Sequence, residues 1–312
     1  MAPRVGFATH PAFLAHDTGE GHPESPQRLE AILTHLRQTD LWPALQHLSP
    51  EPARREILEL VHRPAYLEAL ERACRLGPAA LDPDTIVSPA TWEAACRASG
   101  AVIQSIDELL AGRLDASFCA VRPPGHHALA NRAMGFCVIN HIAVGARYAQ
   151  RRHGVKRVLI VDWDVHHGNG TEAIFADDPS VLYFSTHQWP FYPGTGRASD
   201  SGIGAGQGTT INVPLPPGSG DADLIRAFET RLVPAADAFH PQLVLISAGF
   251  DAHRDDPLAQ LEATETGYAA LTRIVSQIAQ RHASRRIVSM LEGGYALHAL
   301  ARSVESHVGA LL

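Results

Sequence analysis

Short apolar runs and helical repeats of apolar residues alternate along the chain. The runs at 158–161 and 242–248 show little alternation with polar residues, which is typical of strands covered on both faces of a parallel sheet. Between such runs, segments such as 91–111 carry apolar residues at helical spacing. This order favours an α/β fold with a central, mostly parallel sheet of about eight strands and helices on both faces.

The same pattern sets approximate bounds for each element. The expected strands are 5–9, 58–61, 116–121, 158–161, 181–185, 211–214, 242–248 and 286–290. The expected helices are 26–37, 65–75, 91–111, 140–152, 171–175, 221–238, 266–283 and a terminal helix. Residues 10–26, 79–89 and 189–208 show neither period and are expected to be long connections, which in compact domains are often functional.

Length and charge narrow the class of protein. The 312 residues suffice for one large α/β domain or two small ones, and we expect one domain over 1–312. The chain carries 33 acidic and 26 basic residues, a net charge of -7. This balance argues against a nucleic-acid surface and against an anchor on anionic membranes.

The cysteines and the sequence near residue 1 indicate the cellular compartment of the protein. The four cysteines form no C-x-x-C pair, which fits a reduced cytosolic protein better than a disulfide framework or a thiolate zinc site. No basic stretch precedes an apolar core near residue 1, and no run approaches the length of a membrane span. We therefore expect a soluble, cytoplasmic protein.

Polar residues gather where the predicted strands end. Asp162, Asp164 and His166 follow the run 158–161 at a spacing of two, so they would share one side while the extended backbone lasts and could meet one cation. In open α/β sheets, ligands bind at the carboxyl ends of the strands. Other strand ends carry His126 and His127, Ser185 and Thr186, Asp251, and Tyr295.

Three of these side chains have the chemistry of a catalytic metal site. Asp164, His166 and the distant Asp251 would supply three ligands and leave a position open, as in catalytic zinc sites. Such an ion lowers the pKa of a bound water to about 7 and polarises a carbonyl. Each aspartate alone is equally explained by helix capping or a surface ion pair, but the set together favours the metal.

An amide hydrolase also needs groups that move protons and stabilise an oxyanion. His126 and His127 follow two prolines and a glycine that prevent a helix, and imidazole titrates near neutral pH. Tyr295 follows two glycines, so its phenol can be presented at a loop tip as a hydrogen-bond donor. The alternatives are a core histidine and a tyrosine packed after a turn.

Through these motifs the chain resembles the zinc-dependent histone deacetylase family, class II branch, including its bacterial amidohydrolase members and acetylpolyamine amidohydrolases. The resemblance extends from about residue 10 to residue 300 and rests on HDTGEGHPESPQRL, RPPGHHA, GFCVIN, DWDVHHGNGT, FSTHQWPFYPGTG, SAGFDAHRDDPL and LEGGY, in this order. It implies an arginase/deacetylase-like fold. It also implies that Asp164, His166 and Asp251 bind zinc (Zn2+) and that Tyr295 polarises the carbonyl.

The resemblance assigns further roles. His126 and His127 would form the catalytic pair, with His127 as the better candidate for the proton shuttle. Asp162 would bind His126, and Asn169 would orient His127 with a neutral amide, as class II enzymes do. Structural potassium (K+) would bind main-chain oxygens of Asp162, Asp164 and His166, with Ser185 and Thr186 as candidates, and a second ion would lie near Phe175, Asp178 and Val181.

The same resemblance describes a substrate channel. Gly135, Phe136 and Tyr192 would line it, with Leu258 at its mouth. In the polyamine-selective relative a glutamate after the Asp-Pro pair reads the cation of the substrate, so a leucine here resembles the lysine deacetylases.

The sequence therefore predicts zinc-dependent hydrolysis of N-acetyl-lysine in a protein or peptide. An acetylpolyamine amidohydrolase, or another deacylase of small N-acyl amines, is the main alternative. An arginase-type enzyme would need additional bridging aspartates, and a non-catalytic acyl-lysine binder would be expected to have lost the tyrosine or a ligand. Iron(II) and cobalt(II) tolerate similar ligands. Assembly into a homo-oligomer stays open.

Overall fold

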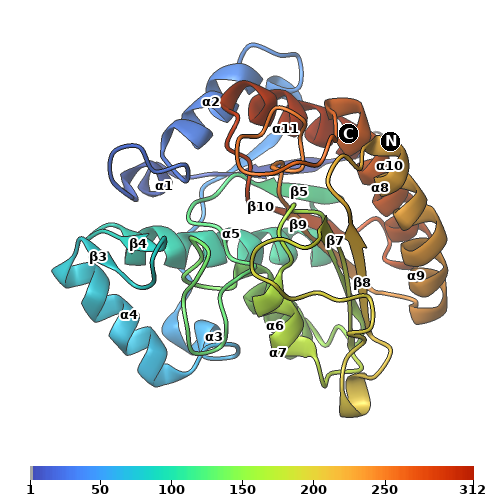
Figure 1. Ribbon diagram of the computed structural model, residues 1–312, viewed down its shortest axis with the longest axis horizontal. Coiled ribbons are helices and arrows are strands. Elements are labelled where there is room, and N and C mark those ends of the chain that lie inside the picture. Colours follow the sequence, from blue (N-terminus) through green and yellow to red (C-terminus); the bar gives the residue numbers. More distant parts are fainter. Residues whose placement is uncertain (1–2) are drawn as a thin grey trace.

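Eight strands form the central sheet of the computed structural model, which describes residues 3–312 (Figure 1). Their order is β2-β1-β5-β10-β9-β6-β7-β8, and every pairing within this sheet is parallel. The strands are β1 Val5–Ala8, β2 Gln46–Leu48, β5 Ala116–Cys119, β6 Val158–Asp162, β7 Val181–Gln188, β8 Thr210–Leu215, β9 Leu243–Ala248 and β10 Ile287–Leu291. The predicted parallel sheet is confirmed.

Helices cover both faces of this sheet. In Figure 1, α2, α8, α9, α10 and α11 lie on one side of the strands and α5, α6 and α7 on the other. The helices are α1 Ala12–Ala15, α2 Gln27–Leu36, α3 Arg55–Leu58, α4 Pro64–Leu76, α5 Thr91–Leu110, α6 His141–His153, α7 Asn169–Phe175, α8 Asp221–Ala227, α9 Val233–Phe239, α10 Glu265–His282 and α11 Leu297–Leu311. Every residue of β6 and β9 is buried between the two layers, as their continuous apolar runs predicted.

The predicted strand at 58–61 is wrong. Arg55–Leu58 is the short helix α3, and the chain continues as a turn in which the His62 N–H donates to the Leu58 carbonyl at 2.9 Å. Leu58 is buried in an apolar cluster with Leu67 and Leu70 of α4. A four-residue run with three apolar members fits a strand or a helical turn equally well, and the packing against α4 decided between them.

The eighth strand of the sheet is instead the edge strand β2, which the apolar pattern missed. Gln46 and His47 of β2 are exposed, so this strand carries no buried run to find. A second difference is the predicted helix 221–238, which the structure divides into α8 and α9 around a π-helical turn at Phe228–Leu232. Pro234 has no N–H to donate to the preceding turn, which accounts for the local change in hydrogen bonding.

The predicted loop at 79–89 contains a separate two-stranded antiparallel sheet, β3 Ala79–Ala80 and β4 Ile86–Val87. Its turn is held by Asp82, whose carboxylate accepts the N–H groups of Asp84 and Thr85. Among residues 3–312, helices long and apolar enough to cross a membrane are absent.

Candidate active site and metal centre

The carboxyl ends of four neighbouring strands bring the candidate residues together. Strands β5, β10, β9 and β6 lie side by side, and the segments that follow them carry, in that order, the histidine pair, Tyr295, Asp251 and the Asp164 to His166 turn. Because all strands run in the same direction, these segments meet at one edge of the sheet.

Asp164, His166 and Asp251 form a group that can hold a metal ion. One ligand atom from each lies within 4.8 Å of the other two. Nδ1 of His166 lies 3.1 Å from Asp164 Oδ1 and 3.2 Å from Asp251 Oδ2. Both carboxylates are buried, and within the described residues Asp251 Oδ2 receives no hydrogen bond of suitable geometry. Two carboxylate oxygens and an imidazole nitrogen fit a divalent ion such as zinc, and the unsatisfied Oδ2 atom of Asp251 is one of these oxygens.

Glycines allow the backbone to approach these carboxylates closely. A Cβ at Gly249 would lie 2.2 Å from Asp164 Oδ2, and one at Gly293 would lie 2.0 Å from Asp251 Oδ2. The Gly293 N–H donates to Asp164 Oδ2 at 2.8 Å, and the Val165 N–H donates to Asp251 Oδ1 at 2.9 Å. The two carboxylates are therefore held by the backbone in a preformed arrangement that any side chain at 249 or 293 would disturb.

The charges of the group require a cation. Burial, and then the neighbouring Asp164, raise the pKa of Asp251 to about 7. Burial opposes the charged form of His166, but the hydrogen bond to Asp164 and the nearby Asp251 carboxylate raise its pKa to about 10. In this arrangement a proton on His166 offsets part of the negative charge of the two acids. A bound divalent ion would replace that proton, because a ligating imidazole must be neutral.

The side chain of Asp162 lies outside the metal group. Its Oδ2 atom lies 3.0 Å from His126 Nδ1 and accepts the Tyr183 hydroxyl at 3.2 Å. Strand β6 ends at Asp162, and the chain then bends, so the alternation expected for Asp162, Asp164 and His166 stops there. The expectation that these three side chains share one cation is therefore wrong.

The histidine pair sits on a loop with a constrained backbone. Pro123 and Pro124 precede it, and Asn140, which caps α6, donates from Nδ2 to the carbonyls of His126 and Ala128 at 3.4 and 3.2 Å. The loop is thus tied to the start of a long helix.

His126 and His127 have different partners and opposite pKa shifts. Their rings lie 4.0 Å apart, with His126 Nδ1 against Asp162 and His127 Nδ1 2.8 Å from Asn169 Oδ1. Burial lowers the pKa of both rings, but Asp162 and Asp164 raise that of His126 well above its usual value. Burial, and then the charges of His126 and His166, hold the pKa of His127 well below its usual value. The two shifts therefore favour the charged form of His126 and the neutral form of His127.

The tautomer of His127 follows from its partner. An amide oxygen only accepts, so His127 donates its Nδ1–H to Asn169 and keeps a lone pair on Nε2. Because His127 lines the cavity described next, this lone pair is available to a proton from a reacting molecule.

A cavity of about 240 Å³ opens above these groups. Its walls are Asp84, Pro124, His126, His127, Gly135, Phe136, His166, Tyr192, Leu258, Gly293 and Tyr295. All four residues expected in a substrate channel are among them. Asp84 was not expected here, because the sequence marks it only as one of two aspartates in the segment 79–89.

The surroundings of Gly135 and Tyr295 in the cavity wall show why these residue types occur there. A Cβ at Gly135, where φ is 55°, would lie 2.4 Å from the His127 ring, so glycine is required there. Tyr295 faces Phe136 edge-on with ring centroids 5.9 Å apart, and the Arg28 guanidinium lies 5.0 Å from the centre of its ring. Burial raises the pKa of Tyr295 well above its usual value, so the phenol stays protonated and can donate.

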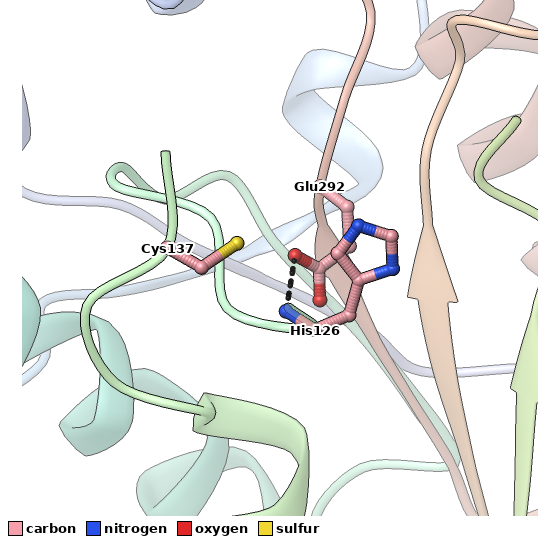
Figure 2. Close-up of side chains that lie close together, drawn as sticks. All are labelled: His126, Cys137 and Glu292. Atoms are coloured by element: carbon pink, nitrogen blue, oxygen red, sulfur yellow. Dashed lines mark hydrogen bonds between the residues drawn. The ribbon is translucent and has the colours of Figure 1, made fainter. Parts of the chain in front are cut away.

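His126, Cys137 and Glu292 form a second buried group, also with ligand atoms within 4.8 Å of one another (Figure 2). This group is a poor metal site. Burial raises the pKa of the Cys137 thiol well above its usual value, and the Glu292 carboxylate already accepts hydrogen bonds from the Gly125 and His126 N–H groups and from Ser247. Glu292 belongs to the motif LEGGY, in which only Tyr295 was given a role from the sequence.

The residues considered for the first potassium ion lie beside this edge, whereas those for the second lie at the amino end of β7, which begins at Val181. Ser185 pairs with Asp162 in the sheet, and its hydroxyl is 2.9 Å from His187 Nδ1. Thr186 is buried, and in the described part of the chain its hydroxyl has no hydrogen-bond partner. At the second position, Asp178 binds Arg147 and Ser180 through its carboxylate, and its N–H donates to the Phe175 carbonyl.

Comparison with known proteins gives consistent matches. A family model described as histone deacetylase domain matches residues 22–311. The chain is 42% identical over 315 residues to human "Polyamine deacetylase HDAC10", with 96% of this chain and 46% of that protein covered. It is 41% identical over 276 residues to "Histone deacetylase-like amidohydrolase" of Pseudomonas aeruginosa, with 88% of this chain and 73% of that protein covered.

A solved structure matches as well. The crystal structure of the HDA15 HD domain has a TM-score of 0.94 to this fold at 37% identity, with 99% of this chain and 88% of that chain covered. These matches confirm the resemblance seen in the motifs and the arginase/deacetylase-like fold.

Proposed function

This chain belongs to the histone deacetylase family, and from that premise we propose that it hydrolyses the amide bond of N-acetyl-lysine in proteins or peptides with a bound zinc ion. The family comprises deacetylases and amidohydrolases. One observation carries the proposal: His127, Tyr295 and His166, which belongs to the group that can hold a metal ion, border the same cavity.

Asp164, His166 and Asp251 would hold the ion. When bound in such a site, zinc lowers the pKa of a water to about 7 and polarises a carbonyl oxygen. The chain itself keeps the two carboxylates buried and positioned by the backbone N–H groups of Val165 and Gly293.

The remaining steps are assigned to the histidine pair and the tyrosine. His127 Nε2 takes a proton from the attacking water, whose oxygen bonds to the acetyl carbon, and returns that proton to the amine nitrogen as the C–N bond breaks. Tyr295 donates its hydroxyl hydrogen bond to the oxygen of the former carbonyl. His126, charged and paired with Asp162, adds positive charge beside the reacting atoms. Acetate and the free amine are the products.

Gly135, Phe136 and Tyr192 would enclose the aliphatic chain of the substrate, with Leu258 at the mouth. The neutral Asn169 beside His127 supports a class II assignment. We also propose potassium at the main-chain oxygens of Asp162, Asp164 and His166 with Ser185 and Thr186, and a second ion near Phe175, Asp178 and Val181.

A deacylase of acetylpolyamines or other small acylated amines is the second candidate. Asp84 is a carboxylate in the cavity wall, and an anion there would attract the additional ammonium group of a polyamine. The relative named as a polyamine deacetylase supports the same alternative.

We further infer that residues 1–312 act as one deacetylase domain in the cytoplasm. The net charge of -7 argues against direct binding to nucleic acid, and the four cysteines are all free and buried.

The test compares kcat/KM of the zinc-loaded protein on an acetyl-lysine peptide with that on acetyl-putrescine and acetyl-cadaverine. The proposal expects the peptide to be preferred and expects a chelator to remove activity, which added zinc restores. Preference for the acetylpolyamines would favour the second candidate. If no substrate turns over with zinc, iron(II) or cobalt(II), the hydrolase proposal is wrong, and binding of the peptide without turnover would indicate an acyl-lysine binder.

A further inference from the structure

We propose that Glu292 is a positioning residue that holds the histidine pair at a set place relative to Tyr295. The inference rests on the proposed function, because it assumes that these groups act on the same substrate. Glu292 follows β10 and is buried at the carboxyl edge of the sheet. Its carboxylate points at the loop that carries His126 (Figure 2).

The carboxylate binds backbone groups of the histidine loop directly. Oε2 accepts the Gly125 N–H at 2.7 Å and the His126 N–H at 3.2 Å, while Oε1 accepts the Ser247 hydroxyl of β9 at 3.0 Å. Among the hydrogen bonds of residues 3–312, these are the ones that join the segment 292–295 to the loop 123–128. Glu292 thus links three neighbouring strand ends.

The main chain around Glu292 is anchored on its other sides. Arg28 of α2 donates to the carbonyls of Glu292 and Gly294, and the Gly293 N–H donates to Asp164. The Tyr295 N–H donates to Asp256 at 2.7 Å. The tyrosine segment is therefore held firmly, and the Glu292 carboxylate transmits that placement to the backbone of the histidine pair.

Placement matters because His127 and Tyr295 must reach different atoms of one amide at the same time. A displacement of about 1 Å in such a pair can reduce the rate by about 100-fold. Affinity for the substrate depends instead on the residues that line the channel, and Glu292 is not one of them. Loss of the Glu292 hydrogen bonds should therefore reduce kcat and leave KM nearly unchanged.

The contacts also suggest a variant that keeps the hydrogen bonds and removes the charge. In Glu292→Gln the amide oxygen can accept both N–H groups, and the amide N–H can donate to the Ser247 oxygen. Burial raises the pKa of Glu292 to about 7, so a neutral side chain is not foreign to this site. Ser247→Ala removes only the third hydrogen bond and serves as the matched control.

The experiment uses the zinc-loaded full chain. For Glu292→Ala we expect kcat to fall about 30- to 100-fold with KM changed less than about three-fold, whereas Glu292→Gln and Ser247→Ala should lose less than about five-fold. Hydrogen exchange at the Gly125 and His126 amides should accelerate in Glu292→Ala only. If that variant does not fold, Glu292→Asp, whose carboxylate falls short of the two N–H groups, takes its place.

Several results would overturn the inference. A normal kcat in Glu292→Ala would do so, as would a Glu292→Gln variant equally impaired, since charge rather than position would then matter. A fall in zinc content or a rise in KM matching the loss of kcat would indicate a general structural role. If the wild-type protein turns over no acylated amine, the proposed function fails, but unchanged amide exchange in Glu292→Ala remains a separate test that refutes the anchoring itself.

Discussion

The strands of the central sheet all begin at one side of the sheet, the amino edge, and all end at the other, the carboxyl edge. Both edges carry pairs of a histidine and an aspartate, but in very different surroundings. At the amino edge, just before strands begin, His153 pairs with Asp107 and His282 pairs with Asp237, each at 2.7 Å, and the two aspartates are 40% and 45% exposed. At the carboxyl edge, His126 pairs with Asp162 at 3.0 Å, and their side chains are 3% and 0% exposed.

The pairs at the two edges differ in how deeply they are buried, not in whether a histidine meets an aspartate. Exposed ion pairs contribute about 0–1 kcal/mol, because water already solvates both charges. Buried groups lose that solvation, so their neighbours set which form is charged, as the opposite pKa shifts of His126 and His127 illustrate. Glycines make the enclosure possible: a Cβ at Gly168 would lie 2.1 Å from Asp162 Oδ2. Function is expected at the enclosed edge only.

The largest expected difference between the two edges comes from replacing one aspartate at each of them. Asp251→Ala deletes one of the three proposed metal ligands, and we expect zinc content and activity to be lost, with kcat/KM reduced by more than about 1,000-fold. Asp237→Ala at the amino edge should leave both unchanged. Zinc analysis and steady-state kinetics measure the outcome, and zinc retained by Asp251→Ala would contradict the proposed ligand set.

Two tyrosines allow the next comparison. Tyr295→Phe removes the hydroxyl proposed to stabilise the oxyanion and should reduce kcat about 100- to 1,000-fold without loss of zinc. Tyr148 donates to Asp107 at 2.9 Å at the amino edge, so Tyr148→Phe should keep the wild-type kcat. An unchanged rate for Tyr295→Phe on an acetyl-lysine peptide would refute its role.

A third comparison adds one negative charge at each edge. Asn169→Asp places a carboxylate beside His127 Nδ1, which stabilises the imidazolium and should raise the pKa of His127 by about 1 unit or more. In the proposed mechanism His127 acts in its neutral form, so the acid limb of the kcat/KM profile should move to higher pH. In the wild type, the lowered pKa of His127 places this limb at lower pH.

Gln242→Glu is the matched change at the amino edge, where Gln242 accepts the Lys156 N–H. It should leave the pH profile unmoved. An acid limb that stays in place in Asn169→Asp, or that moves in Gln242→Glu, would contradict the assignment of His127 as the base.

The smallest expected effect concerns the amino edge alone. A double-mutant cycle of Asp237→Ala and His282→Ala, measured by denaturant unfolding, should give a coupling free energy of about 0–1 kcal/mol. Added salt should weaken the coupling further, because exposed charges are screened. A coupling of several kcal/mol would show that this pair behaves like a buried one.

Much of the fold could be predicted from periodicity, and the exceptions have a common cause. Continuous apolar runs marked β6 and β9 because these strands are buried on both faces. The edge strand β2 has no such run, and residues 58–61 form a false one, because a four-residue pattern does not distinguish a strand from a helical turn. Elements at the periphery depend on packing that a local pattern does not contain.

The candidate site divides in the same way. Polar residues after buried strands, with glycines beside them, are visible in the chain, and they led to the histidine pair, Asp164, His166, Asp251 and Tyr295. Asp84 and Glu292 were missed, since one lies in a loop far from any predicted strand end and the other acts through backbone groups of a distant loop. Contacts between residues so far apart in the chain cannot be recognised from the spacing of residues in the sequence.

The sequence by itself determined where each inner strand stops and which polar side chains follow it, because burial on both faces demands apolar residues until the sheet edge is reached. The tertiary structure decided how those side chains are charged. His126 and His127 are adjacent and chemically identical along the chain, and only the contacts with Asp162, Asn169 and His166 across the sheet shift their pKa values in opposite directions.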